Sequence, residues 1–437
     1  MPTAPLLACV LALVSRAPAG EVPEAVRAWL ATAATPLASF EPDAPLTDLE
    51  PLRAIVGSAR IVALGEASHG SREFFAFKRR ALEFLVRELD FTDFALENGW
   101  EETEAADRWI QGGPGDVGQA LRAFSPLWQT KEYASILEWM RAWNADPAHT
   151  TRIRLHGLDL SNPRAPAREV KAYLERVDET IAGDFGPLLD KLGGLTPGGP
   201  GGSGPTPEGT DLAGLLSIFE ELRRDWIAAT SAAEWARALR CTHVVQQFWI
   251  QQRERRGLDQ TGWRDRCMAD TARWILAQDK TRKLVLSAHN GHVSRDGLAL
   301  VEGYGRIESI GHALEADART AKGEDLSMVV IGCAFAQGGF RAYGKNGLSE
   351  FTLAETPEGS IERELVAAGL VSALVHVDSA PADGPVRAWL DTPRPMTGIG
   401  GSYDPAGPLS DSTRLTTLAA EYDALVFVRT TTAAQAF

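Results

Sequence analysis

Six side chains suited to acid–base chemistry stand directly after four short apolar runs in this chain of 437 residues. They are Glu66 and His69 after residues 60–64 (RIVAL), Glu97 after 91–96 (FTDFAL), Asp159 after 153–158 (IRLHGL), and His289 and His292 after 283–287 (KLVLS). Carboxylates and imidazoles that share one crevice shift each other's pKa values and suit general acid–base catalysis near neutral pH. The pattern therefore predicts one catalytic site, provided that the fold brings the four runs together.

The four runs are short and apolar, and they contain β-branched residues, which is typical of buried parallel strands. Similar runs occupy 328–331, 371–377 and 424–428, and helices are predicted over 71–89, 133–144, 212–230, 232–255 and 264–279. Strands that alternate with helices predict an α/β fold with a mainly parallel sheet covered by helices. Ligands bind such sheets outside the carboxyl ends of the strands, so the six side chains should meet at one edge.

Two cations are predicted to point toward this edge. Arg264 lies four residues before Met268 on the apolar face of helix 264–279, so it needs an anionic partner such as Glu66 or Glu97, or a developing oxyanion. Lys78 lies on the apolar face of helix 71–89 and also points inward. The alternative for Lys78 is a side chain whose stem packs on apolar surface while its charge reaches water.

Two segments stand apart from the alternating pattern. The helices from about 211 to 279 contain no strand, which predicts a helical subdomain packed over the sheet and closing over the active-site cleft. The Gly/Pro-rich stretch 193–209 is incompatible with helix and strand and is predicted to be a flexible loop.

The amino terminus allows two interpretations. The apolar run 6–14 followed by Ala17-Pro18-Ala19 indicates a signal peptide over residues 1–19, which would make residues 20–437 a periplasmic or secreted protein. The absence of Lys and Arg before the run, and Arg16 beside the cleavage position, favour instead an uncleaved terminus and a cytoplasmic protein.

Composition excludes several classes of function. The formal charge of −14, without any basic run, argues against nucleic acid as a partner. The longest apolar run, nine residues, is too short to span a membrane. The four cysteines form no C-x-x-C pair, so neither a disulfide framework nor a zinc-finger-type site is predicted.

The chain also lacks the motifs of common nucleophilic and nucleotide-dependent enzymes. There is no G-x-S-x-G elbow, no Walker A sequence and no G-x-G-x-x-G at a strand–helix turn. A protein nucleophile is not evident, and activated water is the natural substitute. Ten of the twelve tryptophans lie between Trp100 and Trp274, either in helix–helix cores or lining an apolar cleft for a bulky substrate.

Several segments, in this order and spacing, resemble the erythromycin esterase family over roughly residues 50–345. They are GEASHG (65–70), ALENG (95–99), GLDL (157–160), WRDRCMADTARWIL (263–276), LVLSAHNGHVSR (284–295), ESIGHAL (308–314) and SMVVIGCAF (327–335). The resemblance implies an α/β sheet with a helical portion closing over a cleft. It also implies hydrolysis of the lactone ester of erythromycin-type antibiotics, hence macrolide resistance, by histidine-activated water without a required metal.

The resemblance assigns roles to individual residues. It implies His69 as the histidine that activates water, supported by Glu66 and Glu97, with His289 as the second histidine. Arg264 matches the arginine of the family's RDR segment. His292 lies close to this set, and Lys78 stands where the family has a basic residue.

Together these observations predict a hydrolase that cleaves an ester or macrolactone of a small molecule. The predicted catalytic residues are His69, Glu66, Glu97, His289 and Arg264, the predicted substrate-binding residues are Lys78, His292 and Asp159, and no metal or other cofactor is expected. One alternative is a hydrolase that holds a divalent cation with the same His/Glu cluster. Another is a protein that binds a bulky ligand without turnover. The sequence does not indicate an oligomeric state.

Overall fold

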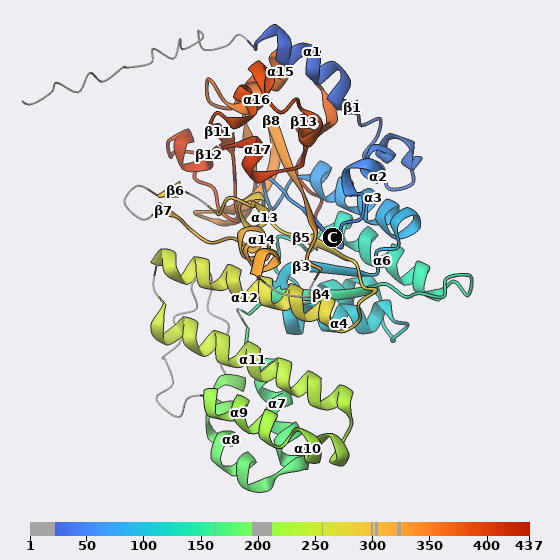
Figure 1. Ribbon diagram of the computed structural model, residues 1–437, viewed down its shortest axis with the longest axis vertical. Coiled ribbons are helices and arrows are strands. Elements are labelled where there is room, and N and C mark those ends of the chain that lie inside the picture. The colour runs from blue at the N-terminus through green and yellow to red at the C-terminus, as the bar shows by residue number, and fades with distance from the viewer. Residues whose placement is uncertain are drawn as a thin grey trace, which may run out of the picture.

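The computed structural model describes residues 22–160, 162–194, 212–255, 257–298, 300–301, 305–320 and 325–437. The candidate signal peptide at residues 1–19 and residues 195–209 of the Gly/Pro-rich stretch lie outside these ranges. Figure 1 shows how the elements within them are arranged.

A nine-stranded mixed sheet forms the centre of the fold (Figure 1). In spatial order its strands are β1 (Ala34–Pro36), β10 (Ser372–His376), β13 (Ala424–Thr431), β8 (Met328–Gly344), β2 (Ile61–Leu64), β5 (Leu284–Ser287), β3 (Asp93–Gly99) and β4 (Arg154–Asp159), with β9 (Gly347–Leu353) paired to β8. The strands from β13 to β4 pair in parallel, whereas β1, β9 and β10 run antiparallel to their neighbours. The predicted α/β fold with a mainly parallel sheet is confirmed.

Helices cover both faces of the sheet and bury two separate cores. The first core packs against α2 (Pro51–Val56), α3 (Arg72–Leu89), α4 (Trp100–Ile110), α5 (Val117–Leu121) and α6 (Lys131–Ala145). The second packs against α1 (Glu24–Ala33), α12 (Gly257–Ala277), α13 (Asn290–Val293), α14 (Ile310–Thr320), α15 (Ile361–Ala367), α16 (Gly384–Asp391) and α17 (Leu418–Glu421). Side chains alternate along β2, so Val62 and Leu64 enter the first core while Ile61 and Ala63 enter the second.

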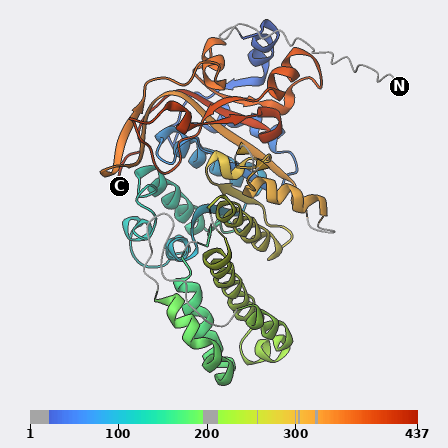
Figure 2. The same cartoon turned by 90° about the vertical axis from the view of Figure 1, so that its left-hand side faces the viewer.

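A third core lies among helices beside the sheet (Figures 1 and 2). It contains residues of α7 (Arg164–Val177), α8 (Glu179–Gly193), α9 (Ala213–Glu221), α10 (Arg223–Ala229) and α11 (Ala232–Glu254). Trp226, Trp235 and Trp249 are buried in it, and Cys267 of α12 joins it to the rest of the molecule. The helical layer therefore includes α7 and α8, which precede the Gly/Pro-rich stretch, as well as helices that follow it.

The remaining elements are short. They are the hairpins β6 (Leu300–Val301) with β7 (Gly305–Arg306) and β11 (Arg394–Thr397) with β12 (Thr413–Thr416), and the 3-10 helices η1 (Leu46–Leu49), η2 (Val377–Ser379) and η3 (Leu409–Ser412). No helix within the described ranges has the length and apolar character needed to cross a membrane.

Two predicted helices differ in their bounds. The predicted helix 212–230 is divided at Leu222 into α9 and α10, which brings Phe219 and Trp226 into edge-to-face contact at 4.9 Å between ring centroids. The predicted helix 264–279 begins earlier, at Gly257, and its first part packs on α11, where Trp263 Nε1 donates to the carbonyl of Gln247.

The register of the sheet aligns the ends of the strands that matter for function. Leu64 of β2 and Leu96 of β3 both lie beside Ser287 of β5. The segments that follow these residues therefore leave the sheet at one level and on one edge. This edge carries the candidate site.

Candidate active site

The six predicted side chains lie at the carboxyl ends of β2, β5, β3 and β4, which are consecutive in the sheet. Contacts between strand ends hold them in one group. Glu97 Oε2 accepts the backbone N–H of His289 at 3.0 Å, and the rings of His69 and His289 lie 5.2 Å apart. The structure thus places all six side chains together, and both predicted cations join them.

His69 is oriented by a buried carboxylate. Its Nδ1 lies 2.6 Å from Oε1 of Glu66, a residue that is 1% exposed. Because an ionised carboxylate only accepts hydrogen bonds, the imidazole proton of neutral His69 lies on Nδ1. Among the described residues Nε2 has no hydrogen-bond partner, so its lone pair can accept a proton from water.

Lys78 of α3 neutralises Glu66 from inside the protein. Lys78 is fully buried, and its Nζ donates to Glu66 Oε2 and, at 2.9 Å, to Ser287 Oγ. Burial raises the pKa of Glu66, but the Lys78 ammonium and the His69 imidazole lower it further than burial raises it. Glu66 therefore stays ionised and holds its two partners.

A hydroxyl pair that the sequence analysis missed backs this group. Ser287 hydrogen-bonds Tyr133 of α6, whose pKa is raised well above its usual value by burial and by the nearby Glu66 carboxylate. The Tyr133 hydroxyl consequently remains protonated. Ser287 could have been predicted from the sequence, because it is a polar residue that ends the apolar run of β5. No sequence pattern around Tyr133 indicates that Tyr133 belongs to the site.

Arg264 of α12 joins the ends of β3 and β4. Its Nη2 lies 2.7 Å from Asp159 Oδ2 and 3.1 Å from Glu97 Oε1. Burial lowers the pKa of Arg264, but the two carboxylates together raise it above its usual value. Of the partners expected from the sequence, Arg264 therefore pairs with Glu97 and not with Glu66.

His292 is held between two buried carboxylates. Its Nδ1 lies 2.8 Å from Asp265 Oδ2, and its Nε2 lies 3.0 Å from Glu97 Oε1. Burial lowers the pKa of His292, but Asp265 and Glu97 outweigh burial and raise it to about 10. His292 is therefore an imidazolium at neutral pH. Asp265 was not predicted, although its place between Arg264 and Arg266 offered a signal.

The charged His292 predicts a pH-dependent contribution to stability. A group whose pKa is raised on folding stabilises the folded protein. For His292 this stabilisation is complete when the pH is below the pKa of the group in the unfolded chain, about 6.5, and it is lost as the pH rises through the folded pKa of about 10. We expect His292→Gln to lower the free energy of unfolding more at pH 6 than at pH 10. Urea denaturation of wild type and variant at both pH values measures this difference.

The matched control replaces an exposed histidine of α14. His312→Gln should leave the pH dependence of the wild type unchanged. Equal destabilisation by His292→Gln at pH 6 and pH 10 would contradict the assignment of a charged His292.

His289 differs in charge from its neighbour. Its Nδ1 accepts the backbone N–H of Gly291 at 3.2 Å, and its buried Nε2 has no partner within the described part of the chain. Burial, together with nearby His69 and His292, lowers the pKa of His289 to about 3. His289 is therefore neutral, and because its Nδ1 is an acceptor, its free Nε2 carries a hydrogen that it can donate.

A segment near the carboxyl terminus forms a further wall beside the two histidines. This glycine segment, residues 398–401, follows β11. A Cβ atom built on Gly401 would lie 3.8 Å from Cδ2 of His69, and one on Gly398 would lie 3.8 Å from Cε1 of His289. Trp128 borders His69 on another side, with 5.5 Å between ring centroids. The sequence analysis did not find either wall.

The carboxylates of the site are engaged by cations of the protein itself. Glu66 pairs with Lys78, and Glu97 pairs with Arg264 and His292. Within the ranges that the structure describes, no three His, Cys, Asp or Glu side chains are grouped to hold a metal ion.

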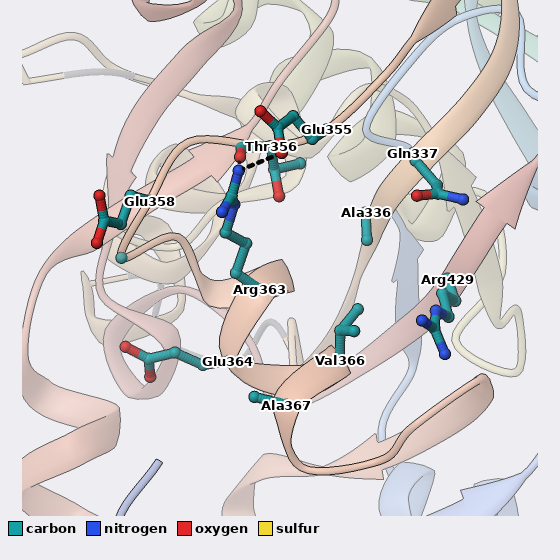
Figure 3. Close-up of a pocket in the computed structure, with 11 residues that line it drawn as sticks. Ala336, Gln337, Glu355, Thr356, Glu358, Arg363, Glu364, Val366, Ala367 and Arg429 are labelled. Atoms are coloured by element: carbon teal, nitrogen blue, oxygen red, sulfur yellow. Dashed lines mark hydrogen bonds and ion pairs between the residues drawn. The ribbon is translucent and has the colours of Figure 1, made fainter. Parts of the chain in front are cut away.

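A cavity of about 380 Å³ lies elsewhere, between α15 and the strands β8 and β13 (Figure 3). None of its lining residues belongs to the site described above. Arg363, which points toward Thr356 and Glu355 at the edge of the cavity, donates to Thr356 O and to Glu355 Oε2, both at 2.6 Å. Glu364 is likewise paired, with Arg394. These charges satisfy one another, and the cavity contributes nothing to the chemistry of the site.

Comparison with known proteins agrees with this geometry. The family model described as erythromycin esterase matches residues 86–431. The chain belongs to the erythromycin esterase family. Membership of the erythromycin esterase family identifies the protein as a hydrolase at the level of the family, with a small molecule as its substrate.

The curated relatives of the chain are distant. Erythromycin esterase type II of Escherichia coli is 24% identical over an alignment 408 residues long, and the alignment covers 81% of this chain and 89% of the relative. The putative hydrolase YbfO of Bacillus subtilis is 26% identical over 167 residues, which cover 37% of this chain and 36% of the relative. Sequence identity at this level does not specify the substrate.

Two solved structures share the fold. A protein of Bacillus cereus has a TM-score of 0.78 at 24% identity, with 94% of this chain and 98% of that chain covered. The erythromycin esterase mutant EreC, in its open conformation, has a TM-score of 0.69 at 19% identity, with 91% and 97% covered. The fold of the family therefore extends over nearly the whole chain.

Proposed function

We propose that the protein hydrolyses an ester or lactone bond of a small molecule with water activated by His69. The observation that carries this proposal is the buried Glu66–His69 pair, which leaves His69 Nε2 as a free acceptor beside the wall formed by the glycine segment. A positioned histidine base of this kind contributes about 10²–10⁴-fold to a rate.

The first step is attack by water on the ester carbonyl. His69 Nε2 takes a proton from the water while the oxygen forms a bond to the carbonyl carbon, and Glu66 stabilises the imidazolium that results. The negative charge moves to the carbonyl oxygen. Neutral His289, with its unpartnered Nε2–H, is the donor that we assign to this oxyanion.

The second step expels the alcohol. The tetrahedral intermediate re-forms the carbonyl and breaks the bond to the alkoxide, which takes the proton back from the His69 imidazolium. One water is consumed, and an acid and an alcohol, or a hydroxy acid from a lactone, are released. His69 returns to its neutral state for the next turnover.

The other residues position these groups. Glu97 fixes the backbone of His289, and Arg264 holds Glu97 and Asp159 at the edge of the site. His292 supplies positive charge beside Glu97. Because Lys78 is fully buried behind Glu66, we assign it the role of holding that carboxylate rather than of contacting substrate.

A macrolactone is the substrate that family membership and the erythromycin esterase relatives favour, and its hydrolysis would give macrolide resistance. The test is a panel of simple esters, lactones and 14-membered macrolides, with products scored by mass spectrometry. A product heavier than its substrate by one water supports lactone hydrolysis. Binding without any product would instead support the interpretation as a ligand-binding protein.

We expect activity to survive exhaustive chelation, because the carboxylates of the site are paired with Lys78, Arg264 and His292. The measurement is the rate of ester hydrolysis before and after dialysis against a strong chelator, with metal analysis of the dialysed protein. Activity that disappears on chelation and returns with a divalent ion would favour the metal-dependent mechanism instead.

A further inference from the structure

We propose that the glycine segment, residues 398–401, is the specificity-determining wall of the site. It lies against the part of the substrate next to the cleaved bond, and the missing side chains at Gly398 and Gly401 set how bulky this part can be. The inference rests on the proposed ester or lactone hydrolysis and deepens it by naming what selects the substrate.

The segment is fixed in place by backbone hydrogen bonds on several sides. Ile399 N–H donates to the carbonyl of Ala67 at 2.7 Å, which joins the segment to the loop that carries His69. Gly398 N–H donates to Ser412 O at 2.9 Å, and Gly401 O accepts from Tyr343 N–H at 2.8 Å. A backbone held by so many partners forms a rigid wall.

A buried carboxylate anchors the start of the segment. Glu362 of α15 is fully buried, and its Oε1 accepts the backbone N–H of Thr397 at 2.6 Å. Thr397 is the last residue of β11 and directly precedes Gly398. Burial raises the pKa of Glu362 to about 7, and the hydrogen bond that its Oε1 accepts fixes the position at which the segment enters the site.

The glycines are not explained by backbone conformation. Neither Gly398 nor Gly401 has a positive φ, so a residue with a side chain could adopt the same backbone conformation. Where the backbone does not require glycine, a glycine lowers the stability of the folded state, because it loses more conformational entropy on folding than any other residue. The missing side chains are therefore best explained by the space that they leave open.

That space adjoins the base and the oxyanion donor of the proposed mechanism, His69 and His289. A Cβ atom at Gly401 would lie 3.4 Å from Cδ1 of Leu127 and 3.8 Å from Cδ2 of His69. One at Gly398 would lie 3.8 Å from Cε1 of His289 and 3.9 Å from Cδ of Arg414. Both glycines are only half-buried, so the space that they leave is accessible. With Trp128 on another side of His69, the segment bounds the approach of a substrate to the base.

The test compares a small and a bulky substrate in variants of the wall. We choose 4-nitrophenyl acetate and erythromycin, and we measure kcat and KM for wild type, Gly401→Ala, Gly401→Val and Gly398→Val. The control is Gly407→Ala, a glycine beyond the segment that also lacks a positive φ and whose added Cβ would meet no residue of the site. Thermal melting confirms that each variant is folded.

We expect Gly401→Val to lower kcat/KM for erythromycin at least about 10-fold more than for the acetate, with Gly401→Ala intermediate and Gly407→Ala unchanged. Equal effects on both substrates in folded variants would overturn the inference while leaving the proposed function intact. A wild-type protein that hydrolyses no member of the panel of simple esters, lactones and 14-membered macrolides would overturn the proposed function and, with it, the role given to this wall.

Discussion

Replacing His69 with alanine should lower kcat for ester hydrolysis by about 10²–10⁴-fold while the protein stays folded. The reason is that His69 Nε2 is the base in the proposed mechanism, oriented through Nδ1 by Glu66. His289 has a backbone N–H and no carboxylate on its Nδ1, and His292 has a carboxylate on each nitrogen. His69→Asn should be equally impaired, because the loss is one of basicity. Steady-state kinetics, with circular dichroism for folding, measures the effect.

The matched control is His149→Ala. His149 precedes the first residue of β4, at the end of that strand opposite Asp159, and stacks on Trp143 with ring centroids 3.4 Å apart. Its Nδ1 hydrogen-bonds the carbonyl of Trp143, which is outside the site. Its loss should leave kcat near the wild-type value. If His69→Ala keeps more than about a tenth of wild-type turnover, the mechanism is wrong, and His289 becomes the base to examine.

Replacing Lys78 with methionine should destabilise the protein by about 3–5 kcal/mol, because it leaves the buried carboxylate of Glu66 without its cation. Activity should fall as well, since an unpaired Glu66 tends to take up a proton and then ceases to stabilise the His69 imidazolium. Urea denaturation gives the change in the free energy of unfolding, and ester hydrolysis gives the change in kcat.

A second substitution separates loss of charge balance from loss of packing. Lys78→Met combined with Glu66→Gln removes both charges, so much of the lost stability should return while activity stays low. The control Lys131→Met removes an exposed lysine whose Nζ contacts Gln435 Oε1 at 3.2 Å, and it should change stability by less than about 0.5 kcal/mol. A double variant no more stable than Lys78→Met would show that packing, and not charge, dominates.

The positions of the strand-end residues followed from local sequence alone. Short apolar runs mark β2, β3, β4 and β5, and parallel pairing puts the residues after them on one edge, whatever the order of strands. The inward direction of Arg264 and Lys78 also followed from helical spacing. Both features depend on the spacing of apolar residues along a strand or helix, and this spacing can be seen in a single sequence.

The remaining parts of the site depend on contacts between distant segments. Tyr133, Trp128 and the glycine segment approach His69 or Glu66 only because α6 and β11 pack where they do, and no local pattern encodes this. The division of the predicted helix 212–230 at Leu222 likewise reflects packing of aromatic rings in the third core. The distances between side chains in the folded protein also decide which residues form ion pairs. Arg264, for example, pairs with Glu97 and not with Glu66.

The order of strands in the sheet bears on how the protein is made. β2, which leads into the loop of Glu66 and His69, pairs with β5 on one side and β8 on the other, and both lie more than 200 residues later in the chain. At about 5–20 residues per second, a ribosome needs on the order of 10–40 s to supply the first of these partners. During that time the apolar β2 has neither neighbour, so the nascent chain depends on chaperones or on other contacts to avoid aggregation.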